Sequence, residues 1–178
     1  MKLETQAEMP PVPKEAREHL FDLIKDFSTA MLVTRGPGGS INARPMAVAQ
    51  LTPDAEAYFA TSLDSPKVWE IEADPRVTVT FQGDDRFAVL EGNAVIVADK
   101  RQIADLWSED WRRWFPRGKD DPTLCLLRVA PQSGEYWDRS GLNGLTFLFD
   151  GLKAILQGTR AETDEPARHA KVQRPGKH

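Results

Sequence analysis

The sequence predicts a mainly β (α+β) protein of one domain: six antiparallel strands in a small closed or split barrel, with peripheral helices. Three observations support this fold class. Six strand-like segments are separated by turn signals at intervals of about 8 to 12 residues. Helical periodicity is confined to short segments beside or between them. The chain has 178 residues and is 40% hydrophobic, which suits a single compact core.

The N-terminal part of the chain predicts an extended arm followed by a helix. Residues 1–13 contain three prolines and no apolar period, which is typical of an extended segment. From Lys14 onward, apolar side chains follow one stripe of a helix, at Leu20, Leu23, Ile24 and Phe27. We expect this helix to cover one face of the sheet.

Three strands then follow in succession and predict an antiparallel meander, with turns at GPGG and TPDAE. Their expected ranges are 30–35, 41–50 and 57–61. A short helix is expected within residues 65–75, because Ser65 suits the N-cap and Pro66 suits the first helical position.

Strands resume after this helix and are followed by a polar tail. The expected strands are 76–82, 86–98 with a bend at Gly92, and 123–138 with an interruption at Pro131. Apolar residues at helical spacing predict helical segments in 99–115 and 142–156. The expected organisation is therefore an arm (1–13), one domain with a C-terminal helix (14–158) and a disordered tail (159–178).

Composition excludes several classes of partner. A formal charge of −4 leaves no excess of positive charge for a nucleic-acid backbone. No apolar run has the length of a membrane span, and the N-terminus has no apolar signal region, so we expect a cytoplasmic protein. Cys125 is the only cysteine and reads as a buried strand residue. Three scattered histidines predict no metal site.

The most informative stretch is residues 61–67, where the third strand ends and a helix begins. A helix start offers N–H groups and a positive dipole end, and here hydroxyl groups and Lys67 gather beside it. Arg44, on the preceding strand, would point a charged fork toward the same rim. These groups together predict a phosphate site. The alternative is structural: Ser65 only caps the helix, Lys67 is solvated and Arg44 pairs with an acid.

Four segments in order resemble the pyridoxamine 5′-phosphate oxidase-like, FMN-binding split-barrel superfamily, and most closely its general stress protein branch. They are NARPMAVA (42–49), YFATSLDSPKVWEIEADPRVTVTF (58–81), VLEGNAVIV (89–97) and VAPQSGEYWD (129–138). The resemblance covers roughly residues 17–140. It implies a homodimer with two flavin sites at the subunit interface.

The resemblance also implies roles for individual residues. Arg44 and Lys67 would contact the phosphate of FMN, assisted by Ser62 and Ser65. The backbone along the isoalloxazine ring and ribityl chain would be that of Pro45, Met46, Ala60 and Thr61.

Two further regions bear on the flavin. Residues 138–142 read DRSGL where vitamin B6 oxidases of this superfamily carry a substrate-gripping Arg-Leu-His-Asp-Arg-like segment, so we do not expect vitamin B6 oxidation. Residues 107–115 hold three tryptophans and Phe115. They predict either a lid over the partner subunit's flavin, with Trp114 and Phe115 as its best candidates, or a helix packed into the core or the dimer interface.

Two functions remain open at this point. The first is a flavin-binding stress protein with a redox or buffering role. The second is a flavin-dependent oxidoreductase that acts on a small substrate with NAD(P)H or oxygen. FMN is the expected cofactor, FAD is possible, and haem or a deazaflavin is a lesser option. A flavin supplies its own redox chemistry, so no catalytic side chain is predicted.

Overall fold

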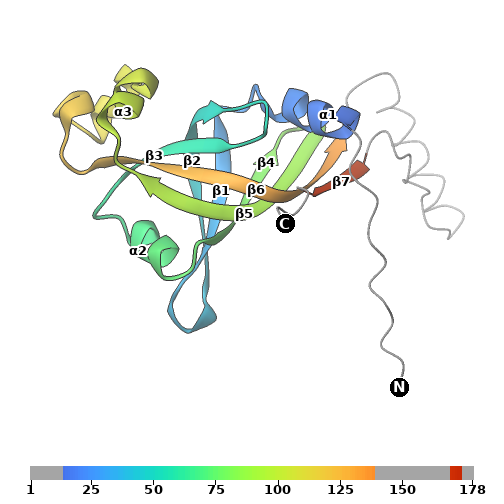
Figure 1. Ribbon diagram of the computed structural model, residues 1–178, viewed down its shortest axis with the longest axis horizontal. Coiled ribbons are helices and arrows are strands. Elements are labelled where there is room, and N and C mark those ends of the chain that lie inside the picture. The colour runs from blue at the N-terminus through green and yellow to red at the C-terminus, as the bar shows by residue number, and fades with distance from the viewer. Residues whose placement is uncertain (1–13, 139–168, 174–178) are drawn as a thin grey trace, which may run out of the picture.

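The strands follow one another in an antiparallel sheet that wraps into a barrel (Figure 1). In this computed structural model, residues 14–138 and 169–173 are described, with side chains from residue 18 to residue 138. The strands are β1 (Thr29–Arg35), β2 (Ile41–Leu51), β3 (Ala57–Ser62), β4 (Arg76–Gln82), β5 (Arg86–Val97), β6 (Leu124–Asp138) and β7 (His169–Gln173).

The length of β6 allows the barrel to close. Along the sheet the order is β3-β2-β1-β4-β5-β6-β7, and β3 also pairs with β6. The first half of β6 pairs with β3, from Leu124 to Val129, while β5 lies along its other edge. Strands β1 to β6 therefore form a closed antiparallel barrel, which confirms the predicted six-stranded split-barrel fold.

The barrel is split between β2 and β3. In the described part of the chain, their register pairs run only from Val48 with Phe59 to Leu51 with Ala57. The earlier half of β2, residues 41–47, pairs with β1 alone, and the end of β3 pairs with β6 alone. The two strands therefore separate near the end of β3, just before α2 (Pro66–Ala73) begins.

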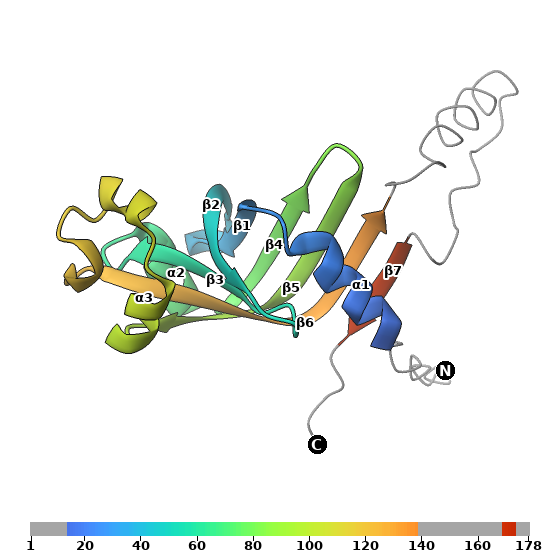
Figure 2. The same cartoon turned by 90° about the horizontal axis from the view of Figure 1, so that it is seen from above.

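Helices lie at the two ends of the sheet (Figures 1 and 2). Helix α1 (Lys14–Ile24) is near the C-terminal end of β6. Helix α3 (Lys100–Leu106) and the 3₁₀ helices η2 (Glu109–Arg113) and η3 (Gly118–Asp120) are at the opposite end. Helix α2 (Pro66–Ala73) joins β3 to β4, and η1 (Pro37–Gly39) lies in the β1–β2 turn.

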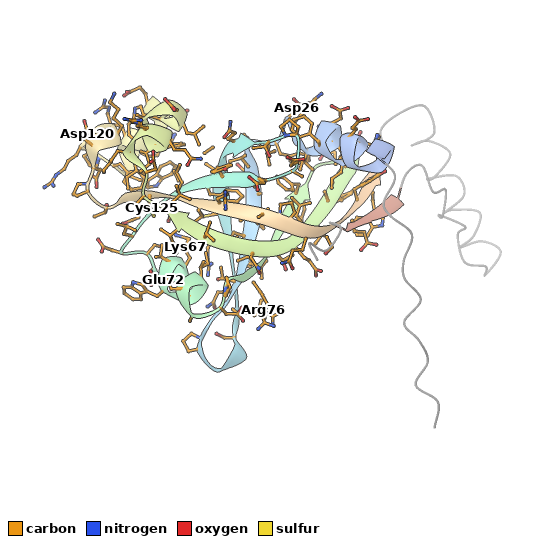
Figure 3. The ribbon with its side chains drawn as sticks, viewed as in Figure 1. Asp26, Lys67, Glu72, Arg76, Asp120 and Cys125 are labelled. Atoms are coloured by element: carbon orange, nitrogen blue, oxygen red, sulfur yellow. The ribbon has the colours of Figure 1, made fainter. Side chains whose placement is uncertain are left out.

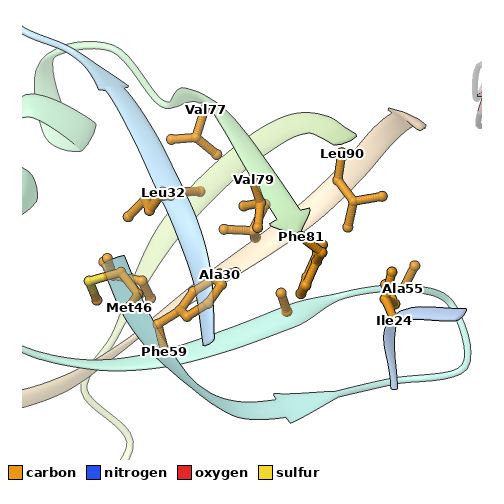
Figure 4. Packing of buried hydrophobic residues seen from close by; sticks show 14 of the residues in the cluster. Ile24, Ala30, Leu32, Met46, Ala55, Phe59, Val77, Val79, Phe81 and Leu90 are labelled. Carbon is orange, nitrogen blue, oxygen red and sulfur yellow. The ribbon is translucent and has the colours of Figure 1, made fainter. Parts of the chain in front are cut away.

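Two hydrophobic clusters stabilise this arrangement. The larger fills the barrel with apolar side chains from all six of its strands and is completed by α1 and α2 (Figure 4). Its fully buried members include Leu32, Phe59 and Phe81. The smaller cluster packs the α3 region against β3 and β6, through Tyr58, Ile103, Trp111, Phe115, Leu124 and Leu126.

Several predicted details differ from the structure. Pro131 does not interrupt β6; the strand continues, and the ladder with β5 shifts register between Glu91 and Gly92, opposite Pro131. A Cβ atom at Gly92 would overlap the carbonyl oxygen of Ala130, so this close approach requires glycine. The predicted helical stretch 99–115 is divided into α3 and η2.

The tail was expected to be disordered, but residues 169–173 form β7, which pairs with β6 from Ser133 to Trp137. The mainly polar composition of the tail did not predict this strand, because the strand is stabilised by pairing with the edge of β6, which is distant in the sequence. The predicted helix at 142–156 lies outside the described residues. None of the described helices is long and apolar enough to cross a membrane.

Candidate phosphate site

Lys67 lies against hydroxyl groups at the start of α2. Its Nζ donates to Thr61 Oγ1 at 3.1 Å and also to the hydroxyl oxygen of Ser65. Ser65 occupies the N-cap position, but its side chain makes no capping hydrogen bond and instead faces Lys67. Ser62 accepts a hydrogen bond from the backbone N–H of Asp64 at 3.3 Å and so stabilises the turn between β3 and α2.

Arg44 belongs to a second polar network beside α2. Its Nη1 donates to Thr34 Oγ1 at 2.6 Å, and its Nη2 donates to Glu70 Oε2 at 2.9 Å. Asn42 donates to Glu70 Oε1 at 2.7 Å, and the hydroxyl of Thr34 donates to the same carboxylate. The side chains of Arg44 and Glu70 are 22% and 11% exposed, so this ion pair is largely shielded from solvent.

The two networks influence each other electrostatically. The pKa of Lys67 is lowered, first by burial of the ammonium and second by the positive charge of Arg44, while Glu70 acts in the opposite direction. Burial alone would raise the pKa of Glu70, but hydrogen bonds from Thr34, Arg44 and Asn42 outweigh it, so that pKa is lowered. The site therefore holds one ionised acid and two cations, and the charge of Arg44 disfavours the charged form of Lys67.

The structural alternative for these residues holds in one respect and fails in two. Arg44 does pair with an acid, Glu70. Lys67 is not simply solvated, because it is partly buried and bonded to Thr61 and Ser65. Ser65 does not cap α2 with its side chain. The local sequence thus predicted that Lys67 and Ser65 lie close together. The pairing of Arg44 with Glu70 depends on the folded sheet, which brings β2 next to α2.

The four residues expected along the flavin ring lie where β2 and β3 separate. The side chains of Met46 and Thr61 point inward and are 8% and 5% exposed. Pro45 is exposed on the outer face of β2, and Ala60 packs at the edge of the smaller cluster. They therefore share no set of side chains; Pro45 and Met46 belong to β2, and Ala60 and Thr61 belong to the adjoining part of β3.

Trp114 and Phe115 differ sharply in environment. The ring of Phe115 is 5% exposed and belongs to the smaller cluster, whereas Trp114 is 59% exposed and lies 4.7 Å from the guanidinium carbon of Arg113. Of the two predicted lid residues, only Trp114 presents its ring to the surface of this chain. Trp111 is buried with Phe115, in agreement with the alternative that this segment packs into the core.

Cys125 and Lys67 lie on neighbouring segments (Figure 3). The thiol is fully buried, and burial raises the pKa of Cys125 to about 11, an effect that the charge of Lys67 partly opposes. A protonated, inaccessible thiol is a packing group, as the sequence predicted.

Sequence reasoning missed three residues of the Arg44 network: Thr34, Asn42 and Glu70. A usable signal was present, because Asn42 and Arg44 alternate along β2 and so share the face that leads into the core at Met46. Two polar residues there require partners inside the fold. Thr34 is the cross-strand neighbour of Asn42, but Glu70 comes from a helix whose position follows only from the fold.

A family model described as pyridoxamine 5′-phosphate oxidase like matches residues 15–162. The chain belongs to this family. The match spans the barrel and the site, and it confirms the family resemblance inferred from the four sequence segments.

Relatives in this family carry the name general stress protein. General stress protein 26 of Bacillus subtilis is 34% identical over 80 residues, which cover 42% of this chain and 56% of that protein. The chain thus matches little more than half the length of this relative. The general stress FMN/FAD binding protein from Xanthomonas citri has a crystal structure with 29% identity and a TM-score of 0.62, covering 72% of this chain and 92% of that one. The General Stress Protein 26 from Bacillus anthracis is 25% identical, with a TM-score of 0.62 and coverage of 68% and 93%.

Proposed function

We propose that this chain is a flavin-binding protein of the general stress type, which holds the phosphate of FMN between Arg44 and Lys67. The observation that carries the proposal is that two cations lie beside α2 near the end of the β2–β3 ladder: Lys67 at the start of the helix and Arg44 on its Glu70. They are close enough for the charge of Arg44 to lower the pKa of Lys67. Burial and the charge of Arg44 disfavour the charged form of Lys67, and the negative charge of a phosphate would offset both effects.

The remaining parts of the site suit the rest of the cofactor. The hydroxyl groups of Ser65 and Thr61 already point at Lys67 and could turn toward a phosphate, with Ser62 at the adjoining turn. Past Val48 and Phe59 the two strands are no longer paired, and the backbone of Pro45 and Met46 on β2 and of Ala60 on β3 could take the ring and ribityl chain. FAD is a second candidate cofactor, since a related protein is named an FMN/FAD binding protein.

The proposed role is to bind flavin for redox or buffering purposes during stress. Its support is the similarity to general stress proteins. A flavin-dependent oxidoreductase acting on a small substrate is the alternative, because a bound flavin brings the necessary chemistry with it.

We further propose a homodimer with the flavin near its interface. The outer face of β2 carries exposed small or apolar residues at alternate positions: Ile41, Ala43, Pro45 and Ala47. Partly buried Met31 and Val33 lie beside Pro45 and Ala43 on β1. Since Pro45 follows Arg44 directly, a second copy on this face would approach the flavin site.

Titration of apoprotein with FMN and riboflavin, followed by flavin fluorescence, tests the phosphate site. Riboflavin lacks the phosphate, so the ratio of the two dissociation constants isolates the phosphate contribution. Lys67→Ala should weaken FMN binding by about 1.5 to 3 kcal/mol, roughly tenfold to 150-fold, with little effect on riboflavin. The double change Arg44→Ala with Lys67→Ala should erase most of the FMN preference.

Lys119→Ala, which removes an exposed lysine on η3, is the matched control and should leave both affinities unchanged. Thermal unfolding of each variant checks that the fold persists, since Arg44→Ala leaves Glu70 without its cation. Equal affinity of the unsubstituted protein for FMN and riboflavin would refute the phosphate site. So would an unchanged preference in the double variant.

A further inference from the structure

We propose that Glu70 is a positioning and specificity-determining residue of the phosphate site: it fixes the guanidinium of Arg44 and also limits the attraction of the site for a phosphate. The inference rests on the flavin-binding function proposed above. It concerns a carboxylate that is largely buried and forms an ion pair with Arg44.

Glu70 ties α2 to the first two strands of the barrel. Its Oε1 accepts from Asn42 at 2.7 Å and its Oε2 accepts from Arg44 at 2.9 Å, while Thr34 donates to the same carboxylate. If the Glu70 carboxylate moved away, these three donors would lose their hydrogen-bond acceptor in a site largely shielded from solvent, which costs free energy. The carboxylate therefore holds the fork of Arg44 in one orientation.

The same residue connects the elements that carry the two cations. Lys67 precedes Glu70 by three residues on α2, so the two side chains share one side of the helix. Arg44 comes from β2. In the described part of the chain, its one hydrogen bond to α2 is the bond to Glu70. Glu70 is thus the link between the helix half and the strand half of the site.

This link reduces the electrostatic attraction for an anion. Arg44 and Lys67 contribute two positive charges and Glu70 one negative charge, so the trio has a net charge of +1. A phosphate that contacts Arg44 would also lie near the Glu70 carboxylate, which Arg44 already contacts, and like charges repel noticeably at a partly buried site. Orientation of Arg44 and repulsion of the ligand are therefore two opposing effects of one side chain.

Two substitutions separate these effects. Glu70→Gln keeps an acceptor oxygen for Arg44 and removes the charge, so the affinity for FMN should rise about threefold to tenfold while that for riboflavin stays constant. The gain should shrink as salt is added. Glu70→Ala removes the acceptor as well, so its FMN affinity should fall below that of the Gln variant. Both are measured by the fluorescence titration with FMN and riboflavin.

Glu72→Gln is the matched control, because it makes the same charge change at an exposed position on the same helix. Its FMN-to-riboflavin ratio should equal that of the unsubstituted protein. A ratio for Glu70→Gln that is unchanged or lowered would overturn the role of Glu70, and so would an equal gain in Glu72→Gln. The decision uses only the Gln variants, so it does not depend on whether Glu70→Ala folds.

The two proposals fail in different ways. If the unsubstituted protein binds FMN no better than riboflavin, the phosphate site itself is wrong and Glu70 has no role in it. If FMN is preferred and the Arg44 and Lys67 changes remove that preference, but Glu70→Gln does not increase it, only the inference about Glu70 is wrong.

Discussion

Phe115 and Trp114 are sequence neighbours with opposite environments, and this contrast yields a test by substitution. Phe115→Ala removes a ring that is 5% exposed and should lower the free energy of unfolding by about 3 to 5 kcal/mol. Trp114→Ala removes a ring that is 59% exposed and contacts Arg113, so it should cost only about 0.5 to 1 kcal/mol. Denaturant unfolding measures both. Equal costs for the two variants would contradict the assignment of Phe115 to the core.

At the residue scale, the sequence predicts features that depend only on neighbouring residues, such as the start of a helix. Ser65, Pro66 and Lys67 mark a helix start within a few residues, and the structure places that start as expected. Phe115 is followed by Pro116 and Gly118, which favour a loop, yet its ring turns inward and is 5% exposed. Glu70 could not be found in this way, because its partners come from β1 and β2 and meet it only after the sheet has formed.

At the scale of elements, most strand ranges agree with the alternation of the sequence to within one or two residues. The exceptions are long-range in origin. Pro131 remains inside β6 because the register shift opposite Gly92 accommodates it, and neither residue signals the other in the sequence. β7 is a strand because β6 extends beyond its pairing with β3 and presents an edge at residues 133–137.

The pairing of β7 predicts that the tail contributes to stability. Removal of residues 169–178 takes five register partners from β6 and should lower the free energy of unfolding by about 1 to 3 kcal/mol, since each lost hydrogen bond costs roughly 0.5 to 1.5 kcal/mol and the freed chain gains entropy. Removal of residues 174–178 alone, which keeps β7, is the control and should have little effect. Thermal and denaturant unfolding of the two truncated chains provide the comparison. Identical stabilities would mean that β7 does not stabilise β6.

At the scale of the whole molecule, the candidate dimer interface is the outer face of β2 and not the 107–115 segment. The sequence analysis left packing at the dimer interface open for the aromatic residues of the 107–115 segment, but Trp111 and Phe115 are buried within the chain. The stronger candidate interface is the outer face of β2, with Ile41 63% exposed at its start. That face was not foreseen, because alternation alone does not say which side of a strand faces the barrel interior.

A charge on this face tests the dimer and its connection to the flavin. Ala43→Glu places a carboxylate on the exposed outer face of β2, beside Val33, where two copies related by symmetry would bring like charges together. The variant should be monomeric by light scattering at micromolar concentration and should bind FMN at least severalfold more weakly. Ala104→Glu makes the same change at an exposed position of α3 and should preserve both properties. If the Ala43→Glu protein stays dimeric, the interface lies on another face; if the unsubstituted protein is a monomer, the flavin site must be complete within one chain.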